Sequence, residues 1–317
     1  MTGRLLLVDA HGLAYRSYYA YQTMRDADGQ PVGMYYGFLR TLLRLEREFG
    51  YPIVLCWDHY GGKARNWRYA IYKDYKASRK SKPDSETLFA QIGKIQQLFR
   101  KIGRPQVGAP GLEADDAIGI LASTVQCNSV LIYTADHDLY QLLDSDRVKI
   151  VHSGDGRFTE VTQQIVERKY GIPVHRWPAF LAFGGDTADH IKPIPGVGPE
   201  TALRMVQAGG RPELPFDQQP AEFRRKFASV ESYWSQVQAA YQVACIPRSF
   251  DDPRIHHLVR RWKVDWSLDV DPDRAMKHFM TFCADHNLVD LLYYRREFVH
   301  AAIKGPAQLG DCLPHSL

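Results

Sequence analysis

The sequence has few cysteines, and they form no recognisable pattern. Five cysteines are scattered over 317 residues, an odd number without any C-x-x-C pair. Such spacing is typical of free thiols in a reducing compartment, and it argues against both a disulfide framework and a zinc site. We therefore expect a cytoplasmic protein.

Long hydrophobic runs, repeats and low-complexity segments are also missing. Nowhere do the roughly eighteen apolar residues that a membrane-spanning helix needs follow one another. The N-terminal apolar run covers only residues 5–8, which indicates a buried strand and not a signal peptide. With 45% hydrophobic residues, the composition is ordinary for a globular protein, and we expect no membrane association.

Charge is present in balance but is divided sharply along the chain. Residues 111–146 contain seven Asp or Glu and no Lys or Arg, whereas residues 61–110 contain twelve Lys or Arg and three acids. The formal net charge of the whole chain is only +4. This separation predicts a cation-binding region beside a surface that holds a polyanion.

Aspartates stand at or just after the end of three apolar segments, which cover residues 4–9, 53–58 and 129–134. Helical patterns at residues 34–49, 88–101, 114–124 and 139–143 alternate with these segments, which predicts a mostly parallel sheet flanked by helices. In such sheets, ligands bind outside the carboxyl ends of the strands. The aspartates would lie there.

The acidic stretch 111–116 (G-L-E-A-D-D) precedes a helical pattern, so its carboxylates would lie in the first helical turn. For one acidic pair, capping of a surface helix is the simpler explanation. However, this stretch is not the only acidic one. Acids at the strand ends add to it, and so do residues 186 and 189, whose spacing would put them on one face if that segment is helical. The total is nine carboxylates. Such a cluster requires hard divalent cations, Mg²⁺ or Mn²⁺. Two such ions about 4 Å apart stabilise phosphodiester displacement.

Two further segments point to nucleic acid. Aromatic and basic residues alternate over residues 65–82, a pattern that suits a single strand, although a solvated basic helix also explains it. Residues 195–202 (P-G-V-G-P-E-T-A) open a helix at 202–207, where backbone amides can approach a phosphate; a plain Gly-Pro turn is the alternative. Beyond residue 209 we expect mainly helix, including an amphipathic stretch at 221–244 and an irregular tail after residue 303.

Together these residues resemble the structure-specific 5′-nuclease family, which includes bacteriophage flap endonucleases and exonucleases and the 5′-nuclease domain of bacterial DNA polymerase I. The match covers residues 4–205. The family's acidic motifs are similar to residues 7–16, 111–119, 134–139 and 185–191. Its basic F-R and Y-K-x-x-R signatures are similar to residues 67–68 and 75–79.

The resemblance implies an architecture and a reaction. It implies a PIN-like catalytic domain over residues 1–182 with a basic arch at 61–110. A helix-three-turn-helix (helix-hairpin-helix-like) DNA-binding element and helical region would follow over 183–303, then a flexible tail at 304–317. The reaction would be metal-dependent 5′-3′ exonuclease and flap endonuclease cleavage in DNA replication or repair, leaving a 5′-phosphate and a 3′-hydroxyl. Substrates would carry 5′ flaps, free 5′ ends, nicks or gaps, or be RNA/DNA hybrids.

The resemblance also assigns residues. One metal ion would be surrounded by Asp9, Asp58, Glu113 and Asp115, with Asp116 in or near its shell, and the other by Asp136, Asp138, Asp186 and Asp189. Lys76, Arg79 and Arg16 would act near the scissile phosphate, and Tyr75 would stack on an unpaired base. Further DNA contacts would come from Arg68, Lys73, Lys80, Lys82, Lys192, Gly196, Gly198 and Thr201, with K⁺ bound at the glycine loop.

Several positions depart from the family pattern. His137 and His190 stand where Lys and Asn are usual, Ala10 replaces a glycine, and Glu200 replaces a lysine. No carboxylate is lost, so we expect an active, monomeric enzyme in a bacterial cell or a phage-infected host. The chain leaves no room for a polymerase, which favours a stand-alone enzyme. The alternatives are a PIN-type metal-dependent ribonuclease and a catalytically silent protein that binds branched DNA.

Overall fold

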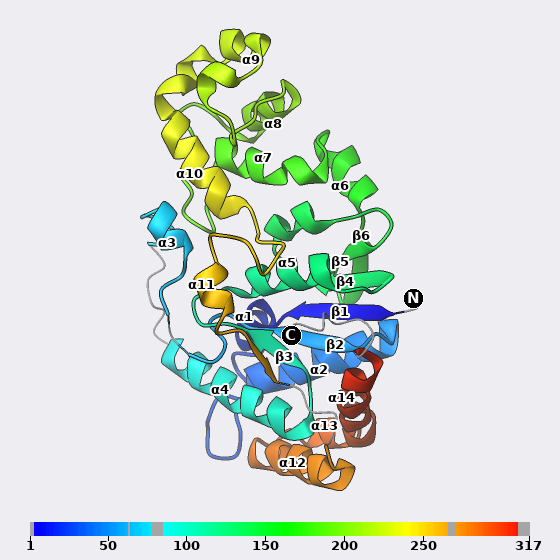
Figure 1. Ribbon diagram of the computed structural model, residues 1–317. Coiled ribbons are helices and arrows are strands. Elements are labelled where there is room, and N and C mark those ends of the chain that lie inside the picture. The colour runs from blue at the N-terminus through cyan, green and yellow to red at the C-terminus, as the bar shows by residue number, and fades with distance from the viewer. Residues whose placement is uncertain (1–2, 63, 78–84, 266–269, 310–317) are drawn as a thin grey trace.

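Seven strands form a single sheet at the centre of the computed structural model, which describes residues 3–62, 64–77, 85–265 and 270–309. The order across the sheet is β6-β5-β4-β1-β2-β3-β7 (Figure 1). The strands are β1 (Arg4–Asp9), β2 (Ile53–Cys56), β3 (Gln106–Gly108), β4 (Ser129–Tyr133), β5 (Val148–Gly154), β6 (Arg157–Val161) and β7 (Lys263–Asp265). The first five pair in parallel and the two edge strands are antiparallel, which confirms the predicted mostly parallel sheet.

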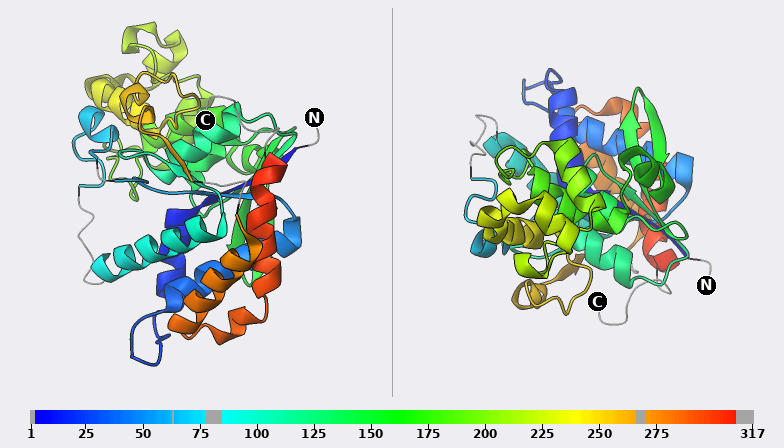
Figure 2. Two further views of the ribbon diagram at one scale, coloured as in Figure 1. Left: turned by 60° about the horizontal axis from the view of Figure 1, so that its bottom comes forward. Right: turned by 90° about the horizontal axis from the view of Figure 1, so that it is seen from above.

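Helices cover both faces of the sheet (Figures 1 and 2). Successive side chains of β1 point to opposite faces, so Leu5 and Leu7 belong to one buried cluster and Leu6 and Val8 to the other. The first cluster is completed by α5 (Ala114–Thr124), α7 (Trp177–Gly184), α8 (Pro199–Gln207) and α10 (Trp234–Ala244). The second is completed by α1 (Ala10–Ala20), α2 (Gly33–Phe49), α4 (Ser85–Ile102), α12 (Pro272–Asp285) and α14 (Arg295–Leu309).

The remaining helices are short and connect these layers. The short α-helices are α3 (Arg68–Ile71), α6 (Gln163–Tyr170), α9 (Ala221–Lys226), α11 (His256–Val259) and α13 (Val289–Leu292). The 3₁₀ turns are η1 (His137–Leu142), η2 (Val174–Arg176), η3 (Phe216–Gln218) and η4 (Ala228–Tyr233). Among the described residues, no helix combines the length and the apolar character needed to cross a membrane.

Several expectations about elements were wrong. The stretch 221–244 is not one helix: Phe227 leaves the helical conformation, its ring packs on Phe223 at 5.0 Å, and the chain continues through η4 into α10. The tail is helical as far as Leu309, because α14 is held by buried side chains such as Phe298 and Val299. Residues 310–317 lie outside the described part. The short strands β3 and β7 were not predicted, since three residues carry too weak a pattern.

The predicted domain boundary after residue 182 crosses a continuous core. Phe183 and Met205, which follow the boundary, share one buried cluster with Leu5 and Val130 of the sheet. Strand β7 also joins the sheet beside β3. The described helices α7, α8 and α10, which lie around or after residue 182, are therefore packed on the sheet.

Candidate active site

The acidic motifs converge at the carboxyl ends of the parallel strands. Asp9 ends β1, Asp58 follows β2 and Asp136 follows β4. Burial raises the pKa of Asp9, and the charge of Asp58 raises it further; burial also raises the pKa of Asp136, and the charges of Asp9 and Asp189 add to that rise. We call this group the acidic edge, and its members are Asp9, Asp58, Glu113, Asp115, Asp136, Asp138, Asp186 and Asp189.

Within the described residues, one group of three carboxylates is close enough to share a cation. Ligand oxygens of Asp138, Asp186 and Asp189 all lie within 4.8 Å of one another. Burial raises the pKa of Asp138 well above its usual range, and four neighbouring charges raise it further, those of Asp136, Asp186, Asp189 and Asp115. Oxygen donors that repel one another in this way fit a hard divalent cation.

The segment that carries Asp186 and Asp189 is a turn, not the helix that the spacing suggested. Asp186 and Ile191 exchange backbone hydrogen bonds of 2.9 and 2.8 Å, which closes the loop between them. The Asp186 side chain also accepts a hydrogen bond from the amide of Ala188 at 2.7 Å. This turn, rather than helical periodicity, brings the two carboxylates to Asp138.

Thr134, which sequence reasoning missed, connects two acids of the edge. Its hydroxyl donates to Asp9 at 3.1 Å and accepts from the Asp136 amide at 3.0 Å. Desolvation raises the pKa of Asp136 to about 6; a hydrogen bond from the Asp138 amide opposes this rise, while the charges of Asp9 and Asp189 increase it. A hydroxyl residue at the end of a strand, two positions before an acid, was the available signal.

Glu113, Asp115 and Asp116 begin α5, but they do not share one environment. Glu113 and Asp116 form a capping box, and Asp116 is completely buried. Asp116 accepts hydrogen bonds from Trp67 at 3.1 Å and from Arg68 at 3.0 Å. It therefore lies in the protein interior, and its place in or near a metal shell stays a prediction.

The DNA contact expected of Arg68 stays a prediction, and in this structure the residue lies in the interior. Its side chain is buried, with only 1% of the residue exposed. The guanidinium lies 3.3 Å from Glu113, 3.0 Å from Asp115 and 2.8 Å from Asp116. To reach a phosphate, the guanidinium would have to give up its contacts with all three carboxylates.

Tyr75 and Lys76 lie between the two parts of the acidic edge. Tyr75 has no exposed surface, and its hydroxyl lies 2.6 Å from Glu113 and 2.8 Å from Asp189, to either of which it can donate its single proton; stacking on a base stays a prediction. Lys76 Nζ lies 2.8 Å from Glu113 and 3.3 Å from Asp189. Desolvation opposes ionisation of Glu113, but the charges of Lys76 and Arg68 hold its pKa down to about 2.

Three of the other predicted cations lie in the described part of the chain. Arg16 lies on α1 with its guanidinium 4.9 Å from the Tyr133 ring centroid. Lys73 is exposed, and Lys192 is exposed and paired with Asp74 at 2.6 Å. The predictions for Arg79, Lys80 and Lys82 concern residues outside the described part of the chain.

The glycine motif forms a turn between α7 and α8. Gly196 has φ +78°, in the left-handed region, and Gly198 is the N-cap of α8 at φ −90°. A Cβ atom at either glycine would meet open space, so their backbones face outward. Thr201 in the first turn of α8 accepts a hydrogen bond from Arg204 at 3.0 Å.

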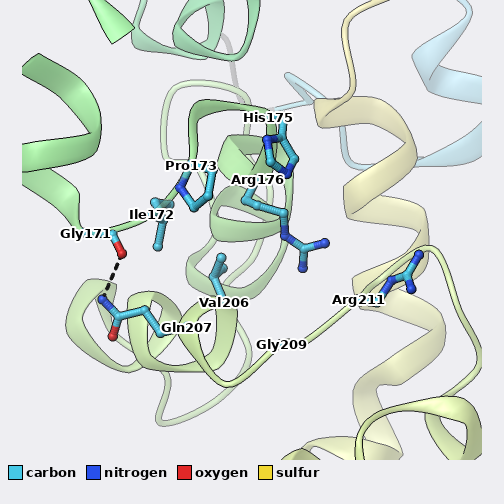
Figure 3. A pocket seen from close by; sticks show the side chains of 9 residues that line it. All are labelled: Gly171, Ile172, Pro173, His175, Arg176, Val206, Gln207, Gly209 and Arg211. Carbon is cyan, nitrogen blue, oxygen red and sulfur yellow. Dashed lines mark hydrogen bonds between the residues drawn. The ribbon is translucent and has the colours of Figure 1, made fainter. Parts of the chain in front are cut away.

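A hollow of about 420 Å³ lies elsewhere, between the end of α6, η2 and the end of α8 (Figure 3). Gln207 donates to the Gly171 carbonyl at 3.2 Å across one side of it, and the side chains of His175, Arg176 and Arg211 line the other. None of the acidic-edge residues lines this hollow. The acidic motifs, and not this hollow, therefore define the candidate site.

His11 is a second residue that sequence reasoning missed. Its Nε2 lies 3.7 Å from Asp58, and its ring packs against Tyr15 at 5.4 Å and Phe89 at 6.2 Å. Asp58 itself accepts a hydrogen bond from the Ala114 amide at 2.8 Å, which connects the end of β2 to the start of α5. His11 follows Asp9 by two positions, which was the available signal.

Solved structures share this fold. The bacteriophage T5 D15 protein co-crystallised with metal ions superposes with a TM-score of 0.59 at 16% identity, covering 94% of this chain and 99% of that one. Human GEN1 in complex with Holliday junction DNA gives 0.53 at 16% identity, covering 96% and 73%. At these identities the likeness establishes a class of fold, the PIN-like 5′-nuclease fold.

Sequence comparison then establishes the family. The family model described as the 5′-3′ exonuclease N-terminal resolvase-like domain matches residues 4–171, so this chain belongs to the 5′-3′ exonuclease family. A thermostable DNA polymerase I of Thermus filiformis is 40% identical over 212 residues, 66% of this chain and 24% of that protein. A 5′-3′ exonuclease of Aquifex aeolicus is 34% identical over 212 residues, 66% of this chain and 71% of that protein. The chain thus spans about a quarter of the length of the polymerase relatives.

Proposed function

We propose that this protein is a structure-specific 5′-nuclease that hydrolyses DNA phosphodiesters near 5′ ends and flap junctions by a two-metal mechanism. The observation that carries the proposal is the acidic edge, where Asp138, Asp186 and Asp189 lie within 4.8 Å of one another and Lys76 lies beside them. Membership of the 5′-3′ exonuclease family supports the same activity. The products would carry a 5′-phosphate and a 3′-hydroxyl.

The acidic edge divides into two candidate ligand sets for Mg²⁺ or Mn²⁺. Asp138, Asp186 and Asp189 would hold one ion, with Asp136 beside them, and Asp9, Asp58, Glu113 and Asp115 would hold the other. When bound, such ions stabilise the attacking and leaving oxygens and supply hydroxide at neutral pH. Asp116 is not included, because Arg68 and Trp67 already occupy its carboxylate.

Lys76 is the proposed catalytic cation. Its ammonium group lies 2.8 Å from Glu113 and 3.3 Å from Asp189, so it faces both ligand sets at once. A scissile phosphate at this point would gain an ammonium group close to its developing charge. Arg16 and Arg79 are proposed to assist at the same phosphate.

DNA is the proposed partner, bound on two sides of the acidic edge. The outward-facing backbone of Gly196 and Gly198 and the start of α8 would hold a duplex phosphate at a helix N-terminus, with Thr201 and Lys192 nearby and K⁺ in the loop. The basic segment would hold the 5′ strand through Lys73, Lys80 and Lys82. A variant of the T5 D15 flap endonuclease has been crystallised as a pseudo-enzyme-product complex with DNA and metal ions, which supports this proposal. We propose that the enzyme acts as a monomer.

The test compares three labelled substrates: a 5′-flap DNA duplex, a gapped DNA duplex and single-stranded RNA, each with Mg²⁺ and with EDTA. We expect Mg²⁺-dependent incision close to the flap junction, with products that a ligase can rejoin. RNA/DNA hybrids with a 5′ flap extend the series. Cleavage of RNA alone would instead identify a PIN-type ribonuclease, and binding of the flap without cleavage would identify a silent DNA-binding protein.

A further inference from the structure

Arg68 has no part in the proposed mechanism, yet it lies at the centre of a buried ionic cluster. Its Nη atoms lie 2.8 to 3.3 Å from the carboxylates of Asp116, Asp115 and Glu113, and its Nε donates to the Val243 carbonyl at 3.0 Å. One guanidinium thus connects α3 to the start of α5 and to the end of α10.

The three carboxylates are used differently. Asp116 accepts a hydrogen bond from one Nη atom of Arg68 at 3.0 Å, and the other Nη atom lies 2.8 Å from its second oxygen; Asp116 has no exposed surface and also accepts the Trp67 indole N–H. Asp115 and Glu113 each offer only one oxygen to Arg68 and retain partly exposed side chains, 17% and 10%. Asp116 is therefore the counterion of Arg68, whereas the other two carboxylates are held by it on one side only.

Asp115 and Glu113 are themselves members of the acidic edge, and the second oxygen of Asp115 accepts a hydrogen bond from the Asp116 amide at 2.7 Å. The charge of Asp115 raises the pKa of Asp138, and the second oxygen of Glu113 lies 2.8 Å from Lys76. A rigid fork with fixed donors orients a carboxylate more strictly than a flexible ammonium group does. Groups that hold metal ligands by hydrogen bonds set the orientation of those ligands.

We propose that Arg68 is a positioning residue that orients Glu113 and Asp115 as metal ligands, with Asp116 as its fixed counterion. This inference rests on the proposed metal-dependent function. Arg68 would then act inside the protein, although it belongs to a basic segment, residues 65–82, that was expected to contact DNA. This role also makes the C-terminal helical region part of the site, because the Val243 carbonyl in α10 fixes the third side of the guanidinium.

The experiment measures Mn²⁺ binding to the whole protein by electron paramagnetic resonance, without substrate. Two variants are compared with the unmodified protein: Arg68→Lys, which keeps the charge and loses the fork, and Arg68→Met combined with Asp116→Asn, which removes the buried pair together. We expect both to raise the Mn²⁺ dissociation constant for one site by about 10- to 100-fold. Circular dichroism and thermal melting establish that each variant is folded.

The matched control is Arg65→Met, an exposed arginine of the same segment, for which we expect unchanged Mn²⁺ affinity. A folded Arg68→Lys or double variant with unchanged Mn²⁺ affinity would overturn the positioning role and leave the proposed function intact. Absence of Mn²⁺ binding in the unmodified protein would overturn the proposed function itself. Unchanged DNA affinity of the folded variants in EDTA is also expected, and a marked loss there would return Arg68 to the DNA-binding surface.

Discussion

Lys76 shows how a single residue can combine backbone strain with charge. Its φ is +50°, a conformation that residues with a Cβ atom rarely adopt. Its amide donates to the Asp189 carbonyl at 3.0 Å, and its side chain reaches Glu113 and the Asp189 carboxylate. Uncommon backbone conformations of this kind are retained where the surroundings fix them, often at functional sites.

We predict that Lys76→Ala slows single-turnover cleavage of a 5′-flap DNA by about 10²- to 10³-fold, because it removes the cation beside the developing phosphate charge. DNA affinity measured with Ca²⁺ in place of Mg²⁺ should change much less. Lys73→Ala serves as the control, since Lys73 is an exposed cation of the same segment and should affect binding rather than the rate. An unchanged rate in Lys76→Ala would exclude the catalytic role.

Asp138 is the acid that connects most members of the acidic edge. We predict that Asp138→Asn lowers the cleavage rate by more than about 100-fold, since loss of a direct ligand should exceed the 10- to 100-fold effect of residues that only orient ligands. DNA binding should persist. Asp146→Asn is the control, because Asp146 is exposed and precedes β5 at the opposite edge of the sheet. Comparable losses in both variants would argue against a specific metal site.

At the scale of elements, the turn between α7 and α8 depends on one glycine conformation. Gly196 adopts φ +78° and Gly198 adopts φ −90°, while a Cβ atom at either position meets open space. Alanine substitutions at the two glycines therefore test two different effects of an added methyl group. At Gly196 it strains the backbone, and at Gly198 it only occupies the space in front of the N-terminus of α8.

We predict that Gly196→Ala lowers the free energy of unfolding by about 1 kcal/mol, because the left-handed conformation is unfavourable for a residue with a Cβ atom. Gly198→Ala should leave stability nearly unchanged. If α8 holds a phosphate through its backbone, both changes should weaken binding of duplex DNA. Urea denaturation and DNA titration of the two variants provide the comparison; wild-type DNA affinity in both would contradict the proposed role of this turn.

At the scale of the whole molecule, folding brings the carboxylates of the acidic edge close to one another, where they repel. Between the unfolded pKa of 3.8 and its folded pKa of about 6, Asp136 binds more protons in the native state than in the unfolded state. Its contribution therefore becomes less favourable to folding as the pH rises through that window. A divalent cation that binds the acidic edge competes with these protons and removes the repulsion.

We predict that Mg²⁺ or Mn²⁺ raises the melting temperature more at roughly pH 7 than at roughly pH 5, where Asp136 takes up a proton instead. Scanning calorimetry with the cation and with EDTA gives the rise in melting temperature at each of the two pH values. Histidines that titrate in this range contribute nearly equally with and without the cation, so their effect on this rise largely cancels. Asp136→Asn should reduce the difference between the rises in melting temperature at the two pH values. A rise independent of pH would contradict binding at the acidic edge.

The acids of the site were predictable because their positions follow from the chain itself. Asp9, Asp58 and Asp136 stand at the ends of apolar segments, and parallel strands bring their carboxyl ends to one edge. The burial of Arg68 and Tyr75 was not predictable, because a basic, aromatic segment is the same sequence pattern whether it faces DNA or carboxylates of the interior. Only the packing of α3 against α5 and α10 distinguishes the two.

The sequence by itself determined the parallel sheet, the family and the set of carboxylates, since alternating apolar patterns and acidic motifs are local properties. The tertiary structure alone decided which carboxylates meet, that Asp186 and Asp189 reach Asp138 through a turn, and that Asp116 is taken by Arg68. The physical reason is that an ionic contact depends on distance in space. Residues 68 and 116, or 138 and 189, come within reach of one another only after the chain has folded.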